Sequence, residues 1–290
     1  MCSRRRRQSR ACCARVAEID ARAARRRFDR AAATYLAAAR LETEVGSRML
    51  ERLDYVRVVP THILDAGCGP APQSAALGKR YPGAQVLAVD FSLPMLQQAR
   101  AVSWLARLRG GRRPLAVCAS LGRLPFAAGA VQLLWSNMAL HWMDEPGAVL
   151  AEFRRVLAPE GLLMFSTLGP DTLKELRAAA GEWRVHRFAD MHDLGDWLMA
   201  AGFSAPVMDM ETLTLEYRDV PALLADLRAT GQTSARADRP RGLAGKGLHA
   251  SLARAGVRAT FEVVYGHAWK GAPRRSADGR SIVQFESRSH

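Results

Sequence analysis

The segment LDAGCGPAP at residues 64–72 constrains the fold of this chain more than any other part of its sequence. A short apolar run ends there at Asp65, and the chain then turns through Gly67 and Gly69. A second apolar run ends at Asp90, 21 residues after Gly69. Glycines let a ligand approach the backbone where a side chain would block it, and an acid at this spacing can accept from both hydroxyls of a ribose. The pattern predicts a strand, a turn and a helix that together bind a nucleoside-like ligand.

The turn lacks one feature of dinucleotide-binding loops. Those loops place a third glycine at the N-terminus of the following helix, where the pyrophosphate binds. Here Ala71 takes that place, and Pro72 flanks it. The sequence therefore favours an adenosyl ligand without phosphates over NAD, and a tight strand-to-helix turn without any ligand stays the alternative.

Apolar runs alternate with helical patterns along the first two thirds of the chain. Five runs are expected to be strands: 62–67, 84–90, 114–119, 131–136 and 162–168. Helical patterns lie near Met95–Leu108 and Ala148–Leu157, and Pro159 and Gly161 mark the end of the second. This alternation predicts an α/β protein with a parallel, doubly wound, Rossmann-like sheet and helices on both faces.

The segments on either side extend the same domain. Residues 22–57 have a helical pattern, as do 171–180 and 194–201, whereas 207–217 and 259–269 alternate like strands near a sheet edge. Between these two strands lies a basic insert with short helices expected at 221–228 and 248–255, well placed to cap an active site. The expected division is a basic tail at 1–25, one domain at 26–270 and a polar tail at 271–290. Within the domain, 26–57 forms N-terminal helices and 218–257 forms the helical cap insert.

The formal charge of +14 is concentrated at the N-terminus. Residues 1–40 hold 12 arginines against Glu18, Asp20 and Asp29, a balance of +9, which leaves +5 for the other 250 residues. Such a run is usually a solvated tail; a targeting peptide and an over-long gene start are the alternatives. The body lacks the aromatic-rich pattern of single-strand binders, so a nucleic-acid partner is not expected.

Membrane and metal sites are not expected either. No window approaches the roughly 18 consecutive apolar residues of a membrane-spanning helix. Five cysteines, an odd number without metal-ligand spacing, favour a reducing, cytoplasmic compartment. Cys68, inside the glycine loop, is interpreted as a small residue and not as a nucleophile, because no base is recognisably paired with it.

Three further stretches resemble the class I S-adenosylmethionine-dependent methyltransferases, whose sheet has seven strands. They are VDFSLPMLQQAR (89–100), LPF (124–126) and WSNMALHW (135–142). By this resemblance the cofactor is S-adenosylmethionine: Asp65 shapes its methionine side, Asp90 binds the ribose, and Phe91 and Met95 line the adenine. Where the family often has an acid before LPF, this chain has Ser120, so the Leu121 backbone is expected to help hold the adenine. The remaining residues implied at the cofactor are Gly67, Cys68, Gly69 and Asn137.

A narrower resemblance suggests the acceptor. RRFDRAAATY (26–35), FSTLGPDTLKELR (165–177) and LLADLRATGQT (223–233) are similar to the malonyl-acyl-carrier-protein O-methyltransferases of biotin synthesis. The resemblance implies methyl transfer to the free carboxylate of a malonyl thioester, which primes pimeloyl synthesis. That carboxylate is ionised at neutral pH, so no general base is required. The implied partner is an acidic acyl carrier protein, for which a basic surface is expected from Arg228, Arg236, Arg239, Arg241 and Lys246 in the insert.

Three residues are candidates for the acceptor site. Tyr35 could bond to the substrate or close over the cofactor, and packing on the core is the equal alternative. Arg187 could hold the carboxylate as a bidentate fork, or be a surface arginine. Trp142 could form a wall of the site, and no base role is assigned to the neighbouring His141.

Two other functions stay open from the sequence alone. VGSRMLERL, LHW and a C-terminal WK also resemble a mitochondrial complex I assembly factor that is similar to a protein-arginine hydroxylase. An S-adenosylmethionine-binding protein without methyl transfer is the second alternative. Two of the stretches quoted above, FDRAAATY and FSTLGPDTLKELR, fit the carboxyl methyltransferases better.

Overall fold

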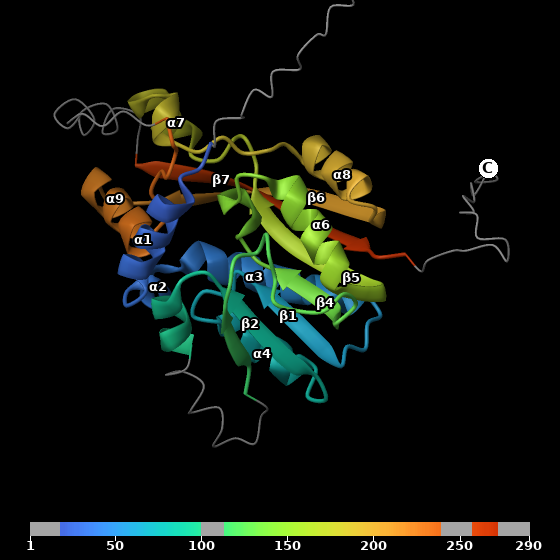
Figure 1. The fold of residues 1–290 in the computed structure, drawn as a ribbon. Coiled ribbons are helices and arrows are strands. Elements are labelled where there is room, and N and C mark those ends of the chain that lie inside the picture. The colour runs from blue at the N-terminus through green and yellow to red at the C-terminus, as the bar shows by residue number, and fades with distance from the viewer. Residues whose placement is uncertain (1–17, 100–112, 239–256, 272–290) are drawn as a thin grey trace, which may run out of the picture.

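A computed structural model describes residues 18–99, 113–238 and 257–271 of the chain. Its centre is a seven-stranded sheet with the order β3-β2-β1-β4-β5-β7-β6 (Figure 1). The strands are β1 (His62–Ala66), β2 (Gln85–Asp90), β3 (Leu115–Cys118), β4 (Val131–Ser136), β5 (Leu157–Leu168), β6 (Ser204–Glu216) and β7 (Arg258–Trp269).

The first five strands are parallel, as the alternation of the sequence predicts. In a parallel sheet all carboxyl ends meet at one edge, so Asp65 on β1 and Asp90 on β2 lie close to the same rim. Strand β7 lies outside the five runs for which a parallel sheet was expected, and it pairs antiparallel with both β5 and β6. The sheet is therefore mixed, and β7 fills the position between β5 and the edge strand β6.

Helices cover both faces of the sheet. They are α1 (Ala21–Ala31), α2 (Tyr35–Ala38), α3 (Arg40–Arg52), α4 (Pro72–Arg80), α6 (Pro146–Val156), α7 (Lys174–Ala180), α8 (Met191–Ala200) and α9 (Val220–Ala229), with residues 93–99 also helical. Short 3-10 turns lie at Leu53–Tyr55, Leu140–Trp142 and Glu182–Arg184.

Successive side chains of β1 show the two layers. Ile63 packs in one buried cluster with residues of α3, α4, α7 and α9. Leu64 points to the opposite face and packs in a second cluster with residues of α6 and α8. Both side chains are fully buried, because a parallel strand with helices on both faces meets apolar neighbours on each side.

The N-terminal tail ends earlier than expected. Residues 18–25, assigned to the tail from charge alone, are part of the folded body: Ile19 forms a β-bridge with Arg236, and Asp20 caps α1 by accepting from the Ala23 N–H at 2.9 Å. Apolar Ile19 and Ala23 are buried, which charge counting did not take into account. Strand β5 also starts earlier than expected, at Leu157, directly after α6 ends at Val156.

Several expectations concern residues outside the described ranges. They are the tail before residue 18, the far part of the helix expected at 95–108, the helix expected at 248–255, the arginines at 239 and 241, the lysine at 246 and the tail after residue 271. In the part of the chain that the structure describes, no helix is long and apolar enough to cross a membrane.

Gly266 on β7 offers a test of the packing between the sheet and its core. A Cβ atom there would lie 2.4 Å from Cζ of Phe165 and 2.8 Å from Sδ of Met208. Gly266→Ala is expected to lower the free energy of unfolding by about 1–3 kcal/mol through overpacking. Gly83→Ala, where no heavy atom lies within 4 Å, is the matched control and should change it by less than about 0.5 kcal/mol. Chemical denaturation measures both, and equal values for the two variants would contradict the packing described here.

Candidate active site

A cavity of about 560 Å³ opens at the carboxyl ends of the parallel strands. The glycine loop after β1, the end of β2, the loop after β3 and the turn after β4 all contribute to its lining. Of the residues expected at the cofactor or acceptor, it brings together Tyr35, Gly67, Gly69, Asp90, Phe91, Met95, Ser120, Leu121, Asn137 and Trp142. A volume of this size suits a ligand of nucleoside dimensions.

The glycine loop has the backbone conformation that its sequence requires. Gly67 and Gly69 have φ values of +79° and +53°, in the left-handed region that glycine adopts without strain. A Cβ atom on Gly67 would lie 2.4 Å from Cβ of Ala139, so a side chain there would collide with the turn after β4. The backbone N–H groups of Gly67 and Cys68 both donate to the Val89 carbonyl on β2, at 2.8 and 3.0 Å. The loop is thus fixed to the neighbouring strand.

Asp90 connects β2 to this loop. Its Oδ2 accepts from the Gly69 N–H at 2.9 Å, and its Oδ1 accepts from the Ser92 N–H at 2.7 Å. The carboxyl group lines the cavity although only 6% of the residue is exposed. Burial, together with the charge of Asp29, raises the pKa of Asp90 to about 6 against the lowering effect of the two N–H groups. An ionised Asp90 still has lone pairs that can accept from ligand hydroxyls.

Asp65 and Cys68 are buried and do not line the cavity. Ser74 on α4 donates its hydroxyl to Oδ2 of Asp65 at 2.6 Å. Burial raises the pKa of the Asp65 carboxyl to about 7. Burial also raises the pKa of the Cys68 thiol, which opposes a nucleophilic role. In this structure Asp65 bonds to α4, and its expected contact with the methionine side of a cofactor stays a prediction.

An aromatic cluster forms one wall of the cavity. Phe28 on α1 lies edge-on to Phe91, with ring centroids 5.8 Å apart, and edge-on to Trp142 at 4.9 Å. Ser92 donates its hydroxyl to Oδ1 of Asp29 at 2.6 Å, which ties α1 to the end of β2. Phe28 was not expected as a site residue, since its helical spacing indicated only a core position. Its place beside Asp29 in the RRFDR stretch is the signal that could have found it.

Tyr35 and Asn137 also line the cavity. The Tyr35 ring is 3.8 Å from the position of a Cβ on Gly69, so it lies over the glycine loop. Burial, followed by the charge of Glu42, raises the pKa of Tyr35 well above its ordinary value, and the phenol stays protonated. Asn137 donates its Nδ2 to the Glu42 carbonyl at 2.9 Å and accepts at Oδ1 from the Ser166 hydroxyl at 2.7 Å. The two hydrogen bonds hold the Asn137 side chain in place.

Glu42 is a buried acid that the sequence did not single out. Only 6% of the residue is exposed, and burial raises the pKa of its carboxyl to about 7. Gln232, in the segment that follows α9, donates its Nε2 to this carboxyl. The contact joins the described start of the cap insert to α3 and, through Asn137, to the cavity wall.

The structure does not bring Arg187 to this cavity. Its side chain is 69% exposed, and its Nη1 lies 3.8 Å from Oε1 of Glu18. It lines a separate cavity of about 360 Å³ that contains neither Trp142 nor the glycine loop. The structure therefore places Arg187 outside the cofactor-sized cavity, and its expected role as a carboxylate fork stays a prediction.

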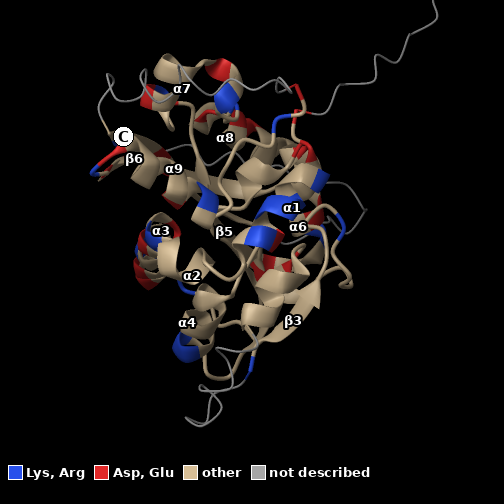
Figure 2. Cartoon of the chain, turned by 90° about the vertical axis from the view of Figure 1, so that its left-hand side faces the viewer, with Lys and Arg blue, Asp and Glu red and all other residues tan. Residues whose placement is uncertain are grey.

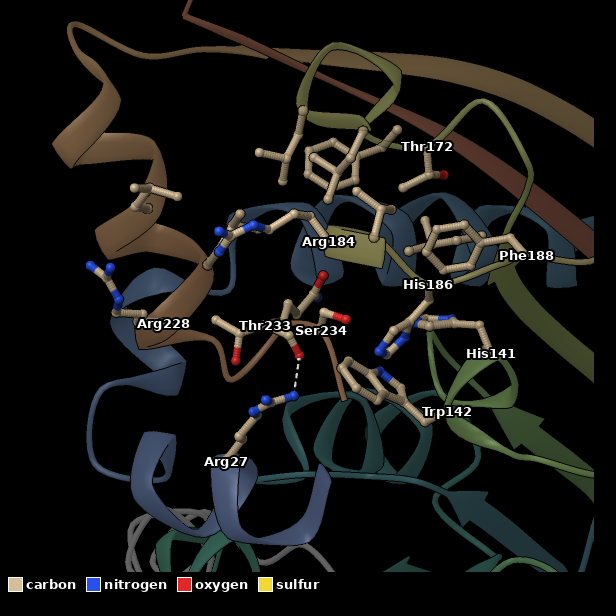
Figure 3. A pocket seen from close by; sticks show the side chains of 18 of the residues that line it. Arg27, His141, Trp142, Thr172, Arg184, His186, Phe188, Arg228, Thr233 and Ser234 are labelled. Atoms are coloured by element: carbon tan, nitrogen blue, oxygen red, sulfur yellow. Dashed lines mark hydrogen bonds between the residues drawn. The ribbon is translucent and has the colours of Figure 1, made fainter. Parts of the chain in front are cut away.

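A second cavity, of about 310 Å³, lies on the other side of Trp142 (Figure 3). Trp142 lines both this cavity and the one at the glycine loop. Its charged lining residues are all arginines, namely Arg27, Arg184 and Arg228, and no Asp or Glu of the described chain lines it. Burial lowers the pKa of His141 to about 3 and that of His186 to about 4, so both lining imidazoles are neutral near pH 7. We call this the arginine-lined cavity.

Comparisons with known proteins agree with this geometry. The family model described as a methyltransferase domain matches residues 64–165. The malonyl-[acyl-carrier protein] O-methyltransferase of Methylovorus sp. (strain MP688) is 50% identical, over 93% of this chain and 96% of the relative. The relative of the same name from Gallionella capsiferriformans (strain ES-2) is also 50% identical, over 92% of this chain and 96% of its own. The malonyl-[acyl-carrier protein] O-methyltransferase 1 of Coxiella burnetii is 37% identical, over 87% of this chain and 89% of the relative.

The chain belongs to the malonyl-[acyl-carrier protein] O-methyltransferase family. This membership confirms the resemblance seen in the sequence, and the hydroxylase-like alternative is not favoured, since these relatives all bear the methyltransferase name.

Solved structures confirm the class I methyltransferase fold and nothing narrower. The YcgJ protein of Bacillus subtilis has a TM-score of 0.57 at 14% identity, covering 77% of this chain and 97% of its own. The [4+2]-cyclase SpnF has a TM-score of 0.53 at 20% identity, covering 79% and 81%. Because a cyclase shares the fold, the reaction of this family member has to be argued from its site.

Asp65 yields a prediction about stability and pH. Its pKa is about 7 in the folded chain and about 3.9 when unfolded, so between these values the folded state binds more protons. The contribution of Asp65 to stability is therefore largest at low pH and is lost as the pH rises from about 4 to about 7. Asp65→Asn should reduce the loss of unfolding free energy between pH 5 and pH 7.5, measured by urea denaturation. Asp54→Asn, at an exposed carboxyl, is the control; an unchanged slope in Asp65→Asn would contradict the buried environment.

Proposed function

We propose that this chain transfers a methyl group from S-adenosylmethionine to the free carboxylate of a malonyl group carried by acyl carrier protein. The product would be the methyl ester that primes pimeloyl and biotin synthesis, as the family resemblance implies. The observation that carries this proposal is the pairing of two cavities at Trp142: one built on the glycine loop and Asp90, the other lined by arginines without acids. A cytoplasmic location and an acidic carrier partner belong to the same proposal.

The cavity at the glycine loop fits the cofactor. Asp90 would accept from the ribose hydroxyls, while Phe91, Met95 and Leu121 offer apolar contacts for the adenine. The bare backbone at Gly67 and Gly69 leaves room for the methionine part. Ser120 lines the same cavity and would supply a hydroxyl where related enzymes often have a carboxylate. When bound, S-adenosylmethionine supplies an electrophilic methyl group.

The acceptor chemistry agrees with the groups available. Neither His141 nor His186 is basic enough to remove a proton near pH 7, since burial keeps both imidazoles neutral with a lowered pKa. An alcohol or amine acceptor would need such a base, whereas a carboxylate is already ionised. The residues of this chain would then act by orienting the carboxylate and excluding water, and good orientation is worth on the order of 7–11 kcal/mol.

Arg27 takes the role first expected of Arg187. It extends from α1 into the arginine-lined cavity, and its Nη1 donates to the Thr233 carbonyl at 2.9 Å, which holds the guanidinium near Trp142 (Figure 3). Its charge contributes to the lowered pKa of His186, a sign of their proximity. We assign one oxygen of the acceptor carboxylate to Arg27, and we assign the Tyr35 phenol and the Trp142 ring to the boundary between acceptor and cofactor.

The affinity for the cofactor is expected to depend on the ionisation of Asp90. A protonated carboxyl must lose its proton before it can accept from both ribose hydroxyls as a carboxylate. Because its pKa is about 6, the affinity for S-adenosylhomocysteine should fall by up to about tenfold per pH unit below pH 6 and level off above pH 7. Titration calorimetry from pH 4.5 to 8 measures this. Asp90→Asn should bind more weakly by tenfold or more and lose the pH dependence; a profile identical to that of the wild type would refute the ribose assignment.

The proposed reaction is tested by mass spectrometry of malonyl-carrier protein incubated with the chain and S-adenosylmethionine. A gain of one methyl group is expected. Arg27→Ala should raise the KM for the acceptor by about tenfold or more, as the loss of a charged hydrogen bond does, without changing the affinity for S-adenosylhomocysteine. Arg187→Ala, at the exposed arginine, should stay within twofold of the wild type. Cofactor-loaded protein that leaves the mass of the acceptor unchanged would reject the proposed function.

A further inference from the structure

The arginine-lined cavity has two distinct ends. Figure 3 shows Trp142, His141 and Phe188 gathered at one end and Arg228, on α9, at the other. Trp142 also borders the cofactor-sized cavity, so the reacting end of an acceptor has to lie there. Arg228 is exposed, so we place the entrance of the cavity beside it. The cavity therefore suits an elongated ligand that enters beside Arg228 and reaches toward Trp142.

The charges along the cavity indicate more than one anionic group. Figure 2 shows that α1 carries basic residues, and one residue of this helix, Arg27, lines the cavity. Arg228 stands at the outer end and makes no ion pair with any described residue. A malonyl carboxylate at the inner end would satisfy Arg27 only. Arg228, at the outer end, could bind a second anionic group of the same ligand, separated from the carboxylate by the length of the cavity.

The wall also offers neutral hydrogen-bonding atoms that no described residue satisfies. Oγ of Ser234 is buried and has no hydrogen-bond partner among the described residues. The same is true of Nε2 of His141, a residue only 9% exposed, whose Nδ1 lies 3.4 Å from Oγ1 of Thr167. Buried polar atoms without a partner cost free energy, so their presence in a cavity wall indicates a ligand with carbonyl or amide groups.

We propose that the arginine-lined cavity binds a phosphopantetheine-type arm, with its phosphate at Arg228, its amide and thioester groups at Ser234 and His141, and its malonyl carboxylate at Arg27. This assignment rests on the proposed function and specifies how the acceptor is held. The same arm occurs in coenzyme A and on carrier proteins. The cavity therefore recognises the arm and not the group to which the arm is attached. Ser234 and His141 are positioning residues, and neither exchanges a proton with the substrate.

The test compares acceptors with and without the phosphate. KM is measured for malonyl-phosphopantetheine, malonyl-pantetheine, malonyl-coenzyme A and malonyl-carrier protein. Arg228→Glu should raise the KM by about tenfold or more for the three acceptors that contain phosphate and leave malonyl-pantetheine unchanged. Arg57→Glu, at an exposed arginine that precedes β1, is the matched control and should change none of them. A rise limited to the carrier protein would mean that Arg228 contacts the protein surface, which overturns the proposal.

The interior contacts are tested separately. Ser234→Ala should raise the KM for all four acceptors by a few-fold with kcat little changed, and His141→Phe should do the same. Both variants should keep the wild-type affinity for S-adenosylhomocysteine and the wild-type melting temperature within a few degrees; Ser234→Ala alone decides the matter if His141→Phe does not fold. Wild-type protein that methylates malonyl-carrier protein while Arg228→Glu and Ser234→Ala keep wild-type KM values rejects the cavity assignment alone. Wild-type protein that forms no methyl ester rejects the assignment and the proposed function together.

Discussion

The bond between the Asp90 carboxylate and the Gly69 N–H, at 2.9 Å, is the interaction on which the rest of the site depends. It joins the end of β2 to the loop that leaves β1. It therefore fixes the position of this loop, and of the Asp90 carboxylate, in the lining of the cavity. The two N–H groups that Asp90 accepts from offset part of the cost of burying this carboxylate. A carboxylate held in this way is already in place when a ligand arrives, and little ordering has to accompany binding.

The aromatic wall follows from the same junction. Ser92, two residues beyond Asp90, bonds to Asp29 and so draws α1 against the sheet edge. That contact carries Phe28 to Phe91 and Trp142, and it carries Arg27 to the far side of Trp142. One short helix therefore lines two cavities with neighbouring residues, the apolar ring on one side and the guanidinium on the other. Trp142 lines both cavities and therefore marks the boundary at which they meet.

The sequence was most informative where local chemistry decides the structure. The spacing of Gly67, Gly69 and Asp90 predicted the loop and its acid because the turn tolerates few other residues. The antiparallel direction of β7 depends on how it pairs with β5 and β6, which no local pattern encodes. Arg187 and Arg27 could not be ranked from residue type, since burial and direction separate them: the first is 69% exposed beside Glu18, whereas the second reaches Thr233 across 206 residues of sequence. Glu42 escaped notice because a lone acid on a helical face is usually solvated.

The distribution of charge gives the site its selectivity for the acceptor. The cofactor cavity is lined by charges of both signs, whereas the charged residues that line the acceptor cavity are all arginines. A dianionic acceptor would be attracted to the arginine-lined cavity, which no acid of the described chain lines. Methylation removes the inner negative charge, and the product would lose its attraction to Arg27 while its outer charge stays. Release of the ester would then need no conformational change, since the transferred methyl group weakens the contact between the substrate and Arg27.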